Sequence, residues 1–310
     1  MIGRPRAWLM IALGLGVLAA LPLLSTGGVL TWGFQVLLYV ALAQSWNVLG
    51  GFGGQVSLGH AAFFGLGAVV TRMLWLSGHP LAVALSAGMV AATMAGVLIG
   101  APTLRLRGPY FAIGTLAVAE ILRITVGNVL PEVSTLSAPA LAGYTLVPRY
   151  LLALMAAVLS TLVAWMLTQT RFGYGLAVVR DDEAVAEAVG VNAFRHKLAV
   201  FVLSSALVGL TGGVFGYYHV SFYPQFAFSP LWTFDALLIT FFGGTGTVWG
   251  PPFAAAVYLL FREALALRLV ELHVLVFGIV FVLVVLAFPG GLVAAWRAFG
   301  PGRLRQTHGS

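Results

Sequence analysis

Three carboxylates interrupt long apolar stretches of this sequence: Glu120, Asp235 and Glu263. Ionisable side chains at membrane depth are costly, and where they occur they commonly serve an ion path or a proton relay. Such carboxylates could couple transport to a proton gradient. The alternative is structural, because Glu120 precedes Arg123 by three residues and could pair with it on one helical face, while the others could cap helix ends. We favour the structural interpretation.

Several other chemistries are disfavoured by what the sequence lacks. Lys197 is the single lysine and lies in a polar segment without the GxxxxGK[ST] pattern, so we expect neither a P-loop lysine nor a buried Schiff-base lysine. The histidines show no i, i+4 pair and no HExxH, and the chain has no cysteine, which argues against a metal site or a thiolate nucleophile. We therefore expect no enzymatic activity and no cofactor bound by this chain.

Charged residues cluster in one stretch, 180–197, which reads RDDEAVAEAVGVNAFRHK. Asp181 is a favourable N-cap, Asp182 and Glu183 would place negative charge at the positive end of a helix, and Gly190 can stop that helix. So short a helix is not stable alone in water, and its apolar residues need a surface to pack on. These residues are Ala184, Val185, Ala188 and Val189. That surface could belong to another protein or to the chain's own membrane domain.

The elements that must position these residues are membrane helices. The chain is 60% hydrophobic and 8% charged, with a mean hydropathy of +1.00, whereas soluble domains are about 25% charged. Apolar runs long enough to cross about 30 Å of hydrocarbon predict an all-α polytopic membrane protein with about ten (eight to ten) transmembrane helices, some broken or re-entrant. The expected spans are 7–24, 30–49, 58–77, 81–101, 109–130, 150–169, 198–219, 231–249, 252–268 and 273–295.

Arginine placement predicts the orientation. Arginines near both termini, at 105–107 and within 171–197 fall on one side if the spans alternate, whereas 131–148 and 220–230 carry almost no positive charge. By the positive-inside rule, both termini, the acidic helix and a short tail, 301–310, are then cytoplasmic. The net charge of +7 therefore requires no nucleic-acid partner.

Two glycine-rich interruptions, GGFGGQVSLGH at 50–60 and GGTGTVWGPP at 243–252, each end one apolar run and begin another. Backbone freed by such glycines must be buried in protein or line a water-filled cavity, and paired broken segments indicate a transport path. The alternative is close helix packing through small residues. The polar side chains that are candidates for lining a path are Gln55, Ser57, His60, Thr245 and Thr247.

Four segments, in order, carry a family resemblance. They read SWNVLGGFGGQVSLGHAAFFGLGA (45–68), LRLRGPYFAIGTLAVAEI (104–121), FGYGLAVVRDDEAVAEAVGVNAFRHKLAVF (172–201) with the GLTGGVFGYY that follows, and GGTGTVWGPPFAA (243–255). Together they resemble the LivM-type permease subunits of branched-chain amino acid ABC importers. The resemblance implies a bacterial inner-membrane subunit that pairs with a second homologous permease, sits on two cytoplasmic ABC ATPases that hydrolyse ATP, and receives substrate from an extracytoplasmic binding protein.

The resemblance also assigns a role to the acidic helix. In that family an EAxxxG-like pattern forms the coupling helix, which fits a groove on the ATPase. The matching region here is 182–192, although the gap from Ala188 to Gly190 is shorter than in the general ABC-importer pattern, so the role carries over rather than the contact details. The residues assigned to coupling are Asp182, Glu183, Glu187, Ala188, Gly190 and Asn192.

We therefore expect a single transmembrane permease domain, 1–300, that forms half of an alternating-access path and is driven by partner ATPases. A branched-chain amino acid is the expected substrate, although similar permeases carry urea, short amides or aromatic acids. Two other classes stay open: a self-sufficient proton- or ion-coupled secondary transporter using the three carboxylates, and a membrane scaffold without transport.

Overall fold

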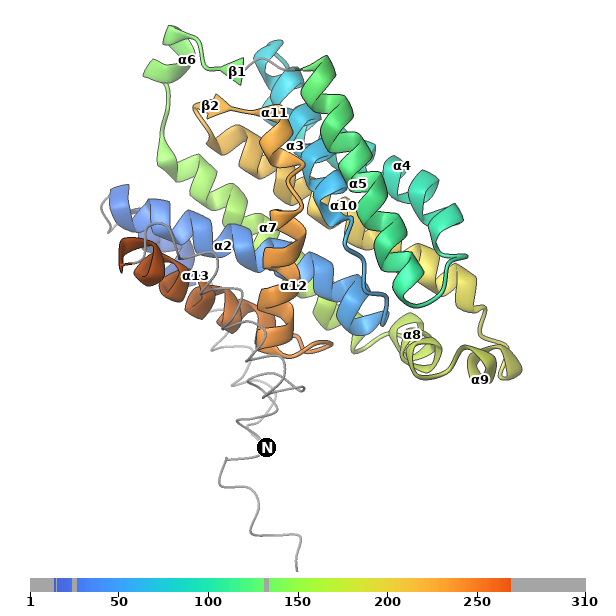
Figure 1. Ribbon diagram of the computed structural model, residues 1–310. Coiled ribbons are helices and arrows are strands. Elements are labelled where there is room, and N and C mark those ends of the chain that lie inside the picture. Colours follow the sequence, from blue (N-terminus) through green and yellow to red (C-terminus); the bar gives the residue numbers. More distant parts are fainter. Residues whose placement is uncertain (1–13, 15, 24–26, 131–133, 269–310) are drawn as a thin grey trace, which may run out of the picture.

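The computed structural model describes residues 14, 16–23, 27–130 and 134–268, and most of them lie in helices (Figure 1). Within these ranges, six helical units are long and apolar enough to cross a membrane. They are α2 with the π-helix η1 (Gly27–Phe52), α4 (Leu81–Thr103), α5 (Pro109–Val129), α7 (Leu146–Leu167), α10 (Ala193–Tyr218) and α11 with α12 (Pro224–Gly243). The chain is thus an all-α, multi-pass membrane protein. Of the expected spans, 7–24 is only partly described, while 273–295 and the tail 301–310 lie outside the described residues.

The ends of these helices follow local chemistry. α5 begins at Pro109, whose fixed φ suits the first helical turn, directly after Gly108 at a φ of +58°. The expected span 231–249 is wrong as one continuous helix. α12 (Leu231–Gly243) ends where Gly244 adopts a φ of +101°, and α13 (Gly250–Arg268) begins after a turn.

Glycines set the tightest helix contacts in the bundle. α3 (His60–Leu76) packs against α10 so closely that a Cβ atom on Gly67 would collide with the backbone of Gly209. A Cβ on Gly212 would likewise meet the Phe64 carbonyl. Small residues allow such backbone approach between membrane helices. These glycines lie outside the two glycine-rich interruptions, 50–60 and 243–252, for which packing was the predicted alternative.

Among the described helices inside the bundle, α3 and α12 are shorter than the roughly 30 Å of hydrocarbon in a bilayer. α3 has 17 residues and α12 has 13, about 26 Å and 20 Å at 1.5 Å per residue. Figure 1 shows an extended segment between the end of η1 (Val48–Phe52) and the start of α3. The N-termini of α3 and α12 meet, because the Ala61 amide donates to Thr233 Oγ1 at 2.8 Å. The broken helices thus begin beside each other inside the bundle.

The two ends of the bundle differ in structure. At one end, β1 (Ser134–Thr135) pairs antiparallel with β2 (Ser221–Phe222), beside α6 (Ala138–Ala142) and α11 (Pro224–Ala227). The buried Arg72 of α3 fastens this end by donating to the carbonyls of Ser134 and Val220, both at 2.9 Å. At the other end lie α8 (Arg171–Asp181) and α9 (Glu183–Ala188), at the lower right of Figure 1.

Candidate functional site: the α8–α9 segment and the broken-helix junction

The acidic helix exists, with a boundary one residue later than predicted. Asp181 is the last residue of α8 rather than an N-cap, and Asp182 caps α9 through its Oδ1, which accepts from the amides of Ala184 at 2.8 Å and Val185 at 3.1 Å. α8 is not among the predicted elements, because its glycines and mixed polarity obscure its helical pattern. Gly190 stops the turn after α9 with a φ of +84°, as predicted.

The apolar face of α9 is largely uncovered within the described residues. Only Ala186 is buried, in a small cluster with Val179 of α8 and Ala193 of α10. The four residues predicted to need a packing surface, Ala184, Val185, Ala188 and Val189, all remain exposed, with Val185 at 52% and Val189 at 66%. Within the described residues, α9 therefore packs against the rest of the chain through the Ala186 side chain, and its other apolar side chains are exposed.

Polar contacts hold α9 against the start of α10. Lys197 of α10, itself buried, forms an ion pair with Glu183, so this predicted coupling residue also has a structural partner. Asn192 caps α10 by accepting from the Arg195 amide at 2.9 Å. Glu187 is exposed. The α8–α9 segment is thus built as a unit with α10, and Glu187 projects from it.

The two glycine-rich breaks lie directly against each other and form what we call the junction, residues 44–54 and 243–250. A Cβ atom on Gly51 would collide with the Gly246 amide nitrogen. Asn47 of α2 accepts from the Gly246 amide at 2.9 Å and donates to the Thr247 carbonyl at 2.9 Å. Gln44, one turn earlier, donates to the Val248 carbonyl at 2.5 Å. Two buried amide side chains therefore hold the second break against the first.

Sequence reasoning missed Gln44 and Asn47. Both lie on an apolar helix just before a glycine break, and free backbone groups at such a break need polar partners inside the membrane. That placement is the signal that could have identified them.

The predicted path-lining residues of the first break lie in a hydrogen-bonded interior. The imidazole of His60 contacts Ser57 Oγ at 3.0 Å through Nδ1 and Ser204 Oγ of α10 at 2.8 Å through Nε2, and all three side chains are buried. Ser204 in turn donates to the Ser45 carbonyl at 2.6 Å. Gln55 is only partly buried. In this conformation Ser57 and His60 are closed off, and a lining role for them stays a prediction.

The residues of the second break are more accessible. Thr245 is exposed, and Thr247 is partly buried with its hydroxyl donating to the Gly244 carbonyl at 2.7 Å. Both lie in the turn that Gln44 and Asn47 hold, so their lining role also stays a prediction.

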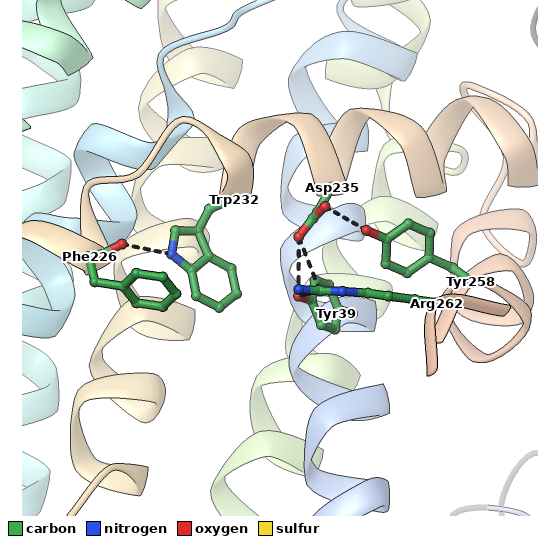
Figure 2. A network of polar contacts seen from close by, with 6 residues as sticks. All are labelled: Tyr39, Phe226, Trp232, Asp235, Tyr258 and Arg262. Carbon is green, nitrogen blue, oxygen red and sulfur yellow. Dashed lines mark hydrogen bonds and ion pairs between the residues drawn. The ribbon is translucent and has the colours of Figure 1, made fainter. Parts of the chain in front are cut away.

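The three carboxylates have different surroundings. Glu120 forms an ion pair with Arg123, as the structural interpretation predicted. Asp235 accepts from Tyr258 at 2.5 Å and from Tyr39 at 3.1 Å, and its carboxylate lies 3.5 Å from Arg262 (Figure 2).

This network joins α2, α12 and α13, and Asp235 is not a helix cap. Glu263 is exposed. In the part of the chain that the structure describes, the carboxylates do not gather into a single relay, and no group of His, Asp and Glu side chains is arranged to hold a metal ion.

A multi-pass helical bundle with paired glycine breaks and a capped, outward-facing helix is the arrangement expected of a transport permease. The model of a family described as "Branched-chain amino acid transport system / permease component" matches residues 28–285. The chain belongs to this permease family. Its members are transport components, and the chain is accordingly a multi-pass inner-membrane permease.

Individual relatives agree with the family. The high-affinity branched-chain amino acid transport system permease protein LivM of Salmonella typhimurium is 28% identical over 320 residues, covering 91% of this chain and 73% of that protein. LivM of Escherichia coli K12 is 28% identical over 311 residues, covering 90% and 73%. The autoinducer 2 import system permease protein LsrC of Shigella flexneri is 28% identical over 189 residues, covering 58% and 53%. No solved structure matches the chain.

Cysteine labelling tests the lining role of the first break in this permease. We expect Gln55→Cys to react with a water-soluble maleimide, because its position is partly exposed and thiolates form where water reaches. Ser57→Cys, nearly isosteric, should be protected in the conformation described and become reactive in one of the two states, nucleotide-free or ATP-trapped. Val97→Cys, on the apolar surface of α4, is the unreactive control. Protection of the cysteines at both Gln55 and Ser57 in both states would leave the first break with a packing role alone.

Proposed function

We propose that this chain is one of two permease subunits of an ABC importer and forms half of the translocation path for a branched-chain or related amino acid. Its partners are a second homologous permease, two cytoplasmic ABC ATPases and an extracytoplasmic binding protein. The observation that carries the proposal is α9, a short helix with its apolar residues uncovered, at one end of a chain that belongs to a transport permease family.

The chemistry of α9 indicates its partner. Its six helical residues cannot form a stable helix without a packing surface, and among the residues that the structure describes only Ala186 of α9 is buried. A partner with an apolar groove would cover Val185 and Val189. The exposed acids around them, Asp182 and Glu187, would favour a basic rim on that groove and speed association. The permease sequence has no P-loop lysine with which to hydrolyse ATP. An ATPase subunit docked at this end would supply that hydrolysis.

The proposal fixes the orientation. The α8–α9 end is cytoplasmic and the β1–β2 end faces the binding protein, which agrees with the arginine distribution of the sequence. Both termini are then cytoplasmic in a domain of about ten spans over 1–300. Substrate specificity rests mainly with the binding protein, so urea, short amides or aromatic acids are alternatives to leucine, isoleucine and valine within the same function.

Site-specific cross-linking tests the docking of α9. A cysteine at Val189 should form a cross-link to an ATPase subunit carrying a single cysteine at the rim of its groove, because Val189 is 66% exposed on the docking face. Val83→Cys is the matched control, since Val83 is 51% exposed in the first turn of α4, toward the opposite end. Cross-linking at Val83 with none at Val189 would place the ATPase elsewhere and contradict the proposal.

A further inference from the structure

The Arg180 side chain of α8 bridges the α8–α9 segment and the junction. Its Nη1 donates to the Gly51 carbonyl at 3.2 Å, in the last turn of η1. The same nitrogen is 3.3 Å from the position that a Cβ atom on Gly246 would occupy. Its aliphatic stem fills the space beside Gly54, where a Cβ atom would collide with Arg180 Cγ. One arginine therefore touches both glycine-rich breaks.

The guanidinium suits this position chemically. Gly51 is in the final turn of a helix, where carbonyls lack intrahelical partners and carry the negative end of the helix dipole. A cation with several N–H donors satisfies such carbonyls. Asp181 accepts from Arg180 Nε at 3.3 Å and helps orient the side chain. Because the glycines of the breaks have no side chains, they cannot donate to the free carbonyl of Gly51, and Arg180 provides that donor.

Arg180 is linked to α9 by a short connection and by side-chain packing. Asp182 is the single residue between the two helices, and the cluster of Val179, Ala186 and Ala193 joins α8 and α9 to the start of α10. The ion pair between Glu183 and Lys197 adds a second attachment. A displacement of α9 therefore moves Arg180 as well. The hydrogen bond from Arg180 to the Gly51 carbonyl would then shift the junction.

We infer that Arg180 is the positioning residue through which movement of the α8–α9 segment sets the relative position of the two breaks. The inference rests on the proposed function of α9 as the ATPase contact. It adds a specific route, in which movement of the ATPase displaces α9 and α8, and Arg180 transmits that displacement to the junction. A coupling free energy between two sites corresponds to about a 5- to 150-fold effect, so loss of the link should be measurable.

The test uses Arg180→Met in the assembled importer in proteoliposomes. Methionine keeps an unbranched apolar stem beside Gly54 and removes the donors to Gly51. We expect ATP hydrolysis to stay within about twofold of wild type while transport per ATP hydrolysed falls about tenfold. Arg180→Lys, which retains a cation and one reachable donor, should recover part of the lost transport. Arg195→Met is the matched control, because Arg195 is an exposed arginine at the start of α10 in the same polar stretch.

A second readout separates coupling from folding. In the wild-type background, Thr245→Cys should label at different rates in nucleotide-free and ATP-trapped states, since Thr245 is exposed within the junction. In the Arg180→Met background that difference should disappear while the melting temperature of the complex stays unchanged. Wild-type transport per ATP in Arg180→Met, or an unchanged labelling difference, would overturn the inference and leave α9 docking intact. Absence of any ATPase association in the wild type would instead contradict the proposed function.

Discussion

Gly190→Pro should abolish substrate-stimulated ATP hydrolysis and transport while leaving the permease folded and inserted. Gly190 has a φ of +84° and its amide donates to the Glu187 carbonyl at 3.0 Å. Proline fixes φ near −65° and has no N–H, so the turn that ends α9 must change and the docking face moves. The measurement is ATPase activity with and without substrate-loaded binding protein.

Gly78→Pro is the matched control for that variant. Gly78 also has a positive φ, +88°, its amide donates to Trp75 at 3.1 Å, and neither glycine has neighbouring atoms where a Cβ would sit. Both substitutions break the same kind of helix-ending turn, but Gly78 follows α3, away from the α8–α9 end. If both variants lost substrate-stimulated ATP hydrolysis equally, or if both retained it, α9 would not be the coupling contact.

Gly67→Leu should destabilise the bundle by about 3 kcal/mol or more, because overpacking at a backbone contact has no flexible side chain to yield. The Cβ alone would collide with the backbone of Gly209 across the α3–α10 interface. We expect a large loss of monodisperse protein in size-exclusion chromatography and a lower melting temperature for what remains.

Gly28→Leu is the matched control for Gly67→Leu, with protein yield and melting temperature measured in the same way. Gly28 lies in the first turn of α2, and nothing lies within 4 Å of the position of its Cβ. It should behave as wild type. A Gly67→Leu protein with wild-type yield and melting temperature would show that the α3–α10 interface tolerates separation.

The sequence predicted the membrane class and most helix ends because these depend on local composition. The expected spans and the structure agree that helices begin at Leu81 and Pro109. The cap of α9 was misplaced by one residue because Asp181 and Asp182 are equally good caps in isolation. In the structure α8 continues to Asp181, with Val179 packed in one cluster with Ala186, so Asp182 is the residue that caps α9.

The junction could be predicted only in part. Glycine-rich stretches indicated both breaks, but nothing in their spacing showed that Gly51 and Gly246 touch, because that contact depends on how α2, α12 and α13 pack. Asp235 illustrates the same limit. A sequence shows an isolated carboxylate, whereas its partner Tyr39 lies 196 residues away on α2. Its other partners, Tyr258 and Arg262, lie on the next helix, α13, which must fold back against α12 to reach it.

Uptake by the reconstituted importer distinguishes an ATP-driven permease from a proton-coupled transporter. The permease, its homologous partner, two ATPases and a binding protein are placed in proteoliposomes, and accumulation of radiolabelled leucine, isoleucine or valine is followed. We expect uptake that requires ATP on the ATPase side and persists when a protonophore collapses the proton gradient. Uptake driven by a pH gradient through this chain without any ATPase, and lost in Asp235→Asn, would contradict this expectation and support a secondary transporter.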